Sequence, residues 1–83
     1  METEDASARI KKDIMAFEES IKIAEQFSQD LRIKEIVELS KMYAADSKHY
    51  LDKGDLLTSF SCISYAHGLL DAAMSFVGAS KYV

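Results

Sequence analysis

The stretch YLDKGDLL, residues 50–57, holds a lone glycine between two long segments of helical periodicity that contain no proline. Gly54 stands just past the last expected helical position, where a glycine takes the left-handed conformation that ends a helix at little cost. Asp55 follows at once, and its side chain can cap the next helix. A connection this short forces the flanking helices to lie antiparallel. We therefore predict that Gly54 and Asp55 form a rigid structural turn and not a flexible hinge.

The segment before this turn repeats apolar and small residues every three or four positions, which is the pattern of one helix face. The repeat comprises Ile33, Ile36, Val37, Ser40, Tyr43, Ala44, Ser47, Tyr50 and Leu51. Lysines spaced seven residues apart, interleaved with acidic residues, occupy another side and indicate a solvated face. Ser28 or Asp30 can cap the start. We expect a helix near residues 31–53.

The first segment shows the same spacing. Its apolar stripe comprises Ile10, Ile14, Phe17, Ile21 and Ala24, with charged residues on the other faces. The stripe stops near Phe27, where FSQD supplies capping residues instead. We expect a helix near residues 4–27.

The third segment has a wider apolar arc than the other two. One stripe comprises Leu56, Phe60, Ile63, His67, Leu70, Met74 and Val77. A second apolar set comprises Cys62, Tyr65, Leu69 and Phe76. The remaining positions are small instead of charged, and among them Gly68 is unfavourable inside a helix unless another helix approaches closely. We expect a helix near residues 55–78 that exposes apolar surface.

These segments predict an all-α fold, a three-helix up-down-up antiparallel bundle in which residues 1–83 form a single domain. The chain has 83 residues, of which 48% are hydrophobic, with no proline and three glycines. The apolar content is too high for a disordered chain. A chain of this length buries only about 60–65% of its unfolded surface, so its core is marginal unless it is well packed or shared.

Charge and cysteine usage exclude several classes of function. The net charge is −4 and the basic residues are scattered, which argues against nucleic acid or an anionic membrane as a partner. Cys62 is the only cysteine, so no internal disulfide and no cysteine-based zinc site is expected. The N-terminal METEDASARIKK has no apolar core of a signal peptide, and the weakly charged run at residues 56–80 contains His67 and Asp71. We expect a cytoplasmic protein without a cofactor.

The stretch YLDKGDLLTSFSCISYAHGLLDA, residues 50–72, resembles the signature of the archaeal domain of unknown function 357, a family of small three-helix proteins. The matching positions are Tyr50, Leu51, Lys53, Gly54, Asp55, Phe60, Ile63, Tyr65, Ala66, Gly68, Leu70 and Asp71. The preceding EIVELSKMYAADSKHYL, residues 35–51, is similar to the middle helix of the same family. The likeness covers about residues 33–73. It implies a helical bundle of archaeal source and no assigned activity.

Two groups of polar side chains are candidates for a site of chemistry. Ser64, His67 and Asp71 share one helix face, but successive turns of one helix aim side chains in parallel, so no catalytic triad is expected. We predict instead a His67–Asp71 hydrogen bond that satisfies a half-buried imidazole. Asp46 and His49 cannot converge with that pair on a metal ion, because the two pairs stand about 7 Å or more apart along the bundle.

The favoured interpretation is a non-enzymatic protein-interaction module that self-associates through the third helix, most simply as a dimer. An unidentified protein partner stays open. The predicted contact surface comprises Cys62, Tyr65, Leu69 and Phe76. The alternative is an accessory bundle that binds a small ligand or nucleotide in a pocket near His67 and Asp71, where Ala44, Ala66, Gly68 and Ala73 would leave room between helices.

Overall fold

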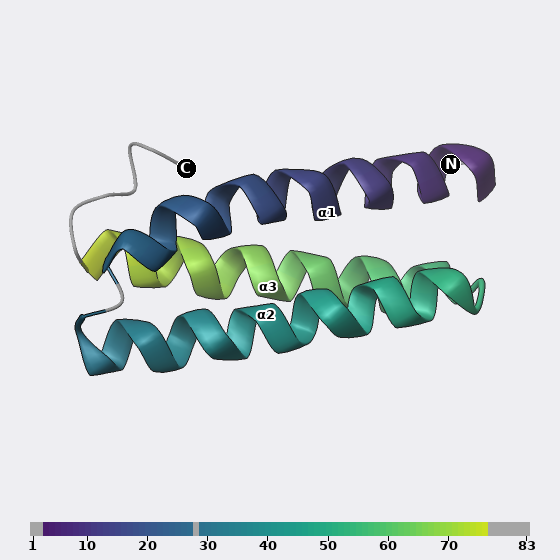
Figure 1. Ribbon diagram of the computed structural model, residues 1–83. Helices are drawn as coiled ribbons and strands as arrows, with labels where there is room; N and C mark the ends of the chain where they lie inside the picture. The colour runs from purple at the N-terminus through teal and green to yellow at the C-terminus, as the bar shows by residue number, and fades with distance from the viewer. Residues whose placement is uncertain (1–2, 28, 77–83) are drawn as a thin grey trace.

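The computed structural model describes residues 3–27 and 29–76. Three helices run through this part of the chain: α1 (Thr3–Ala24), α2 (Leu31–Asp52) and α3 (Leu56–Phe76). The short 3₁₀ helix η1 (Glu25–Phe27) extends α1. The three helices lie side by side, with α2 antiparallel to both α1 and α3 (Figure 1). The predicted all-α, up-down-up bundle is therefore confirmed, and the described residues include no strand.

The helix bounds agree with the sequence to within one or two residues. The helix expected at 4–27 is α1 with η1, and the helix expected at 31–53 ends at Asp52. The third begins at Leu56, because Asp55 stays outside it, and the last two positions expected in it lie outside the described residues. In the part of the chain that is described, no helix is both long and apolar enough to cross a membrane.

Gly54 and Asp55 form the turn that their types predict. Gly54 has a φ of 81°, which is the left-handed region. Its N–H donates to the Leu51 carbonyl at 3.0 Å, and the Asp55 N–H donates to the Tyr50 carbonyl at 2.9 Å. These two bonds are a Schellman motif, which satisfies the last free carbonyls of α2. A carboxylate oxygen of Asp55 then accepts from the Thr58 N–H at 3.2 Å, so one turn both ends α2 and caps α3.

The start of α2 is capped by Asp30, one of the two residues proposed for that role. Its carboxylate accepts from the Arg32 N–H at 2.9 Å and also pairs with the Arg32 guanidinium at 3.2 Å. The pKa of Asp30 is held below its usual value, first by the side-chain hydrogen bond from Arg32 and next by the backbone N–H of the same residue. Ser28, the other proposed cap, lies outside the described residues.

The core lies between the three helices, and α3 contributes most to it. The buried apolar residues are Ile10, Ile14, Phe17, Ala24, Ile33, Val37, Ala44, Ile63, Ala66, Leu70, Ala73 and Met74. Ala44, Ala66 and Ala73 lie within this packed cluster, so in the core small side chains bring the helices together. Phe60, predicted to belong to the core stripe, keeps 38% of its surface exposed.

Two buried serines join α2 to α3. The Ser47 hydroxyl donates to the Ser59 carbonyl at 2.8 Å, and the Ser59 hydroxyl donates to the Ser47 carbonyl at 2.6 Å. Both side chains are fully buried, and within the described residues every buried side-chain nitrogen or oxygen has a partner. Small side chains at this crossing let the two helices approach closely while their polar groups stay satisfied.

Candidate functional site

The side of α3 that faces away from the core is the strongest candidate for a contact surface. We call it the α3 face. It comprises Leu57, Phe60, Ser61, Ser64, Tyr65, Gly68, Asp71, Ala72, Ser75 and Phe76, all exposed. Leu57 and Phe76 keep 80% and 76% of their surface exposed, and Tyr65 keeps 53%. Asp71 is the only charged residue in the whole of α3. The face is thus apolar or small along its length.

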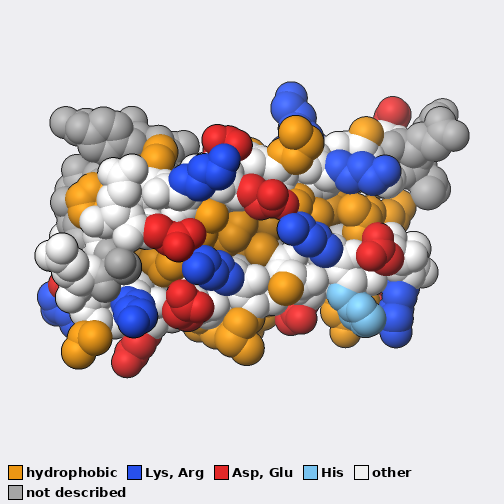
Figure 2. All heavy atoms as spheres, in the orientation of Figure 1, with side chains coloured by type: hydrophobic (Ala, Val, Ile, Leu, Met, Phe, Trp, Pro, Cys, Tyr) orange, Lys and Arg blue, Asp and Glu red, His pale blue; other side chains and the backbone are white. Residues whose placement is uncertain are grey.

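The exposed sides of α1 and α2 have a different character. In the view of Figure 2, acidic and basic side chains intermix over the surface of these two helices. Some of them form ion pairs between elements. Lys48 Nζ of α2 lies 2.9 Å from Glu18 Oε1 of α1, and Lys41 Nζ of α2 lies 3.6 Å from Glu25 Oε2 of η1. Charged side chains of this kind favour contact with water. Large apolar side chains are exposed among these charges too, at Met15, Leu31, Leu39 and Met42, so the α3 face differs from the other two helices in its near lack of charge.

The four residues predicted as a contact surface do not lie equally open. Tyr65 and Phe76 are exposed, whereas Cys62 and Leu69 are half-buried. The Tyr65 ring packs against the Tyr43 ring with centroids 4.5 Å apart, so one side of it is covered by α2. Burial raises the pKa of the Cys62 thiol, so less of it is present as the reactive thiolate.

The middle of the exposed side of α3 does not coincide with the four residues predicted as a contact surface. At about 100° per residue, Cys62 and Leu69 turn toward the flank of α3, while the middle of the exposed side falls on Gly68. Leu57 belongs to this side and was not predicted, although the same angular count places it there. The helical periodicity of the sequence therefore indicated which side of α3 is exposed. The predicted contact surface differed because it was chosen by apolar residue type.

The packing of the three helices does not require a glycine at position 68. A Cβ atom built on this glycine meets no other atom within 4 Å. The close helix approach that could offset the cost of Gly68 is therefore not supplied by α1 or α2. A glycine inside a helix is less favourable than alanine by about 1 kcal/mol, and nothing in the described residues offsets that cost.

His67 is held by α1 and not by Asp71, so the predicted hydrogen bond between them is wrong. The Nε2 atom of His67 lies 2.9 Å from the backbone carbonyl oxygen of Asp13. The imidazole also meets the edge of the Phe17 ring, with centroids 5.7 Å apart. His67 turns toward the flank of α3 that contacts α1, whereas Asp71 turns to solvent. The imidazole is satisfied as expected, but by a backbone group that the sequence did not indicate.

The family of the chain follows from its sequence as a whole. The sequence matches the family described as "Protein of unknown function (DUF357)" over residues 4–78. The chain belongs to the DUF357 family. The match takes in the residues of α2 and α3 and nearly all of α1, so it extends well beyond the residues that carried the resemblance. Searches of curated proteins and of solved structures found no match.

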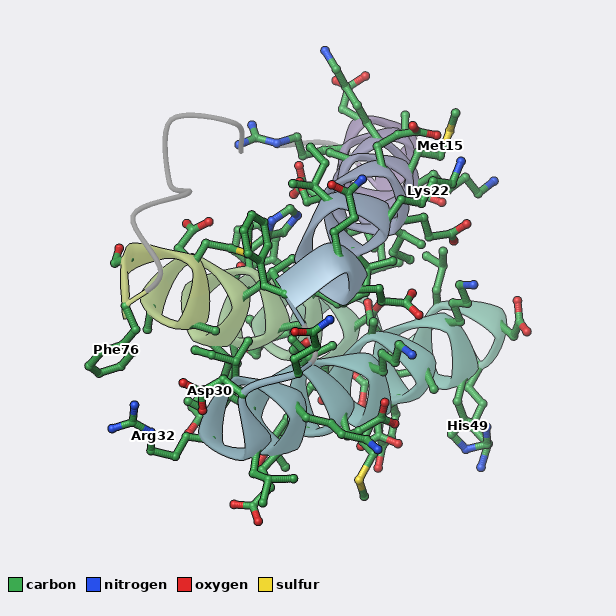
Figure 3. The ribbon with its side chains drawn as sticks, turned by 60° about the vertical axis from the view of Figure 1, so that its left-hand side comes forward. Met15, Lys22, Asp30, Arg32, His49 and Phe76 are labelled. Atoms are coloured by element: carbon green, nitrogen blue, oxygen red, sulfur yellow. The ribbon has the colours of Figure 1, made fainter. Side chains whose placement is uncertain are left out.

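The histidines of the candidate metal site lie apart in the DUF357 bundle. His49 points away from the bundle (Figure 3) and packs edge-on against the Tyr50 ring, with centroids 5.3 Å apart. His67 faces α1. Over residues 3–27 and 29–76, no three side chains of His, Cys, Asp or Glu gather closely enough to hold a metal ion. The arrangement therefore offers no candidate ligand set.

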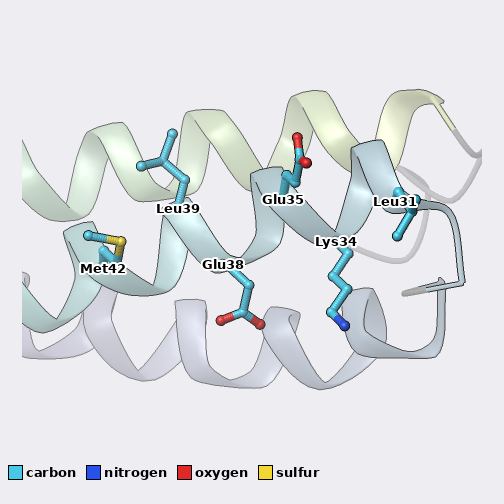
Figure 4. Close-up of a pocket in the computed structure, with 6 residues that line it drawn as sticks. All are labelled: Leu31, Lys34, Glu35, Glu38, Leu39 and Met42. Carbon is cyan, nitrogen blue, oxygen red and sulfur yellow. The ribbon is translucent and has the colours of Figure 1, made fainter.

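Two hollows of this DUF357 protein lie away from His67 and Asp71. One of about 160 Å³ lies where α2 begins and α3 ends, and it is lined by Arg32, Ile33, Ile36 and Phe76. Phe76 projects from the end of α3 beside it (Figure 3). The other is a shallow depression on the outer side of α2, lined by Leu31, Lys34, Glu35, Glu38, Leu39 and Met42 (Figure 4). Neither supports the predicted ligand pocket near His67 and Asp71.

Proposed function

We propose that this DUF357 protein is a non-enzymatic interaction module that pairs with a second copy of itself through the α3 face. The observation that carries the proposal is the exposure of large apolar side chains on a helix whose only charge is Asp71. Exposed apolar patches on small proteins usually mark a contact site. An 83-residue bundle also gains stability when its marginal core is extended by a partner.

The charge distribution favours the α3 face over the charged sides of α1 and α2 as the place where two copies would meet. Each chain carries a net charge of −4, so two copies repel one another over most of their surface. Repulsion between two copies is least at the α3 face, because Asp71 is the only charge there. For the same reason, contact at this face removes only one charge of each copy from water. The depression on α2 is a weaker candidate, since contact there would also remove Lys34, Glu35 and Glu38 from water.

Sedimentation of the full chain over micromolar concentrations tests the proposal. We expect the mass to rise with concentration from the 9.3 kDa monomer toward twice that value. Ala72 is exposed on the α3 face, and Ala72→Glu would place a charge in the contact. We expect it to raise the dissociation constant about tenfold or more, which corresponds to about 1.4 kcal/mol.

Two matched substitutions serve as controls. Ala16 and Ala45 are also exposed helical alanines, on α1 and α2, and their change to Glu should leave the dissociation constant unchanged. Circular dichroism melts would show that all three variants fold. A monomer at every concentration, or an equal effect of Ala45→Glu and Ala72→Glu, would overturn the proposal.

A further inference from the structure

We draw no further inference here: the strongest candidate, the hollow of about 160 Å³ between the start of α2 and the end of α3, is lined by the last described residue, Phe76, and nothing in the structure shows what covers it.

Discussion

Ser47 and Ser59, twelve residues apart, each donate a side-chain hydrogen bond to the other's backbone carbonyl across the contact of α2 and α3. Their hydroxyl oxygens also lie 3.0 Å apart. Because both side chains are fully buried, the pair fixes the distance between the two helices with no unsatisfied polar atom. The α2–α3 hairpin is therefore joined at two places, this pair and the turn at Gly54.

Ser59→Ala should lower the free energy of unfolding by about 1 kcal/mol, since it removes one buried hydrogen bond and leaves Ser47 with fewer partners. Ser61→Ala is the matched control. The Ser61 hydroxyl bonds to the Leu57 carbonyl within α3 and is exposed, so its loss should change stability by less than about 0.5 kcal/mol. Urea melts of both variants measure the difference. Equal midpoints would contradict a stabilising role for the buried pair.

The two described glycines should respond to alanine in opposite directions. Gly54→Ala should destabilise the protein by about 1 kcal/mol or more, because its φ of 81° is strained for a residue with a Cβ. Gly54→Val should cost still more, and Gly54→Asn less. Gly68→Ala should stabilise the bundle by about 0.5–1 kcal/mol, since the added methyl meets open space.

These glycine variants are compared by urea melts at protein concentrations low enough for the chain to be monomeric. Under that condition, any contact across the α3 face does not enter the comparison. A parental midpoint for Gly54→Val would show that the turn does not need the left-handed conformation. A loss of stability in Gly68→Ala would show that Gly68 serves the single bundle after all.

Asp55→Ala should lower the free energy of unfolding by about 0.5–2 kcal/mol through loss of the cap on α3. The carboxylate accepts from the Thr58 N–H at 3.2 Å, and alanine offers no acceptor. Asp55→Asn keeps an oxygen at the same place and should retain most of the stability. If Asn and Ala behave alike in thermal melts, the side-chain bond contributes little and the turn rests on Gly54.

The fold was predictable because each of its signals is local. The apolar spacing in α1 and α2, the Asp30 cap and the Gly54–Asp55 turn depend on residues within one or two helical turns. The rotation of each helix about its own axis is not a local property, because it depends on how the helix packs against the other two. The sequence therefore could not show that the hydrogen-bond partner of the His67 imidazole is the carbonyl of Asp13, 54 residues away, and not Asp71.

The candidate contact surface was only half predictable for a related reason. An apolar residue on the flank of α3 is covered or open depending on how near α2 lies, and that distance is set by Ser47 and Ser59 in the core. Tyr65 is partly covered by Tyr43 in this way. The lack of charge along α3 and the centre of its exposed side at Gly68 could both be read from the sequence, whereas the cover that α2 gives to Tyr65 needed the packed structure.

Stability should fall at low pH in part through Asp30. Its pKa is lower in the folded protein than in the unfolded chain, because it accepts hydrogen bonds from Arg32. The unfolded state then binds more protons near the unperturbed value of 3.8, so this stabilisation is present above about pH 4 and is lost as pH falls below it. Arg32→Gln should flatten the stability profile between about pH 5 and pH 2. An unchanged profile would contradict the pairing.

His67→Ala should destabilise the bundle by about 1–3 kcal/mol, whereas Asp71→Asn should change its stability by less than about 0.5 kcal/mol. The first change removes the partner of the Asp13 carbonyl and the edge contact with Phe17, which together hold α1 against α3. The second changes a solvent-facing group that takes no part in that contact. Urea melts of the two variants, at concentrations where the chain is monomeric, decide between the two partners. An equal loss of stability in both variants would support a His67–Asp71 hydrogen bond. A loss of stability in His67→Ala alone would support the contact of the imidazole with α1.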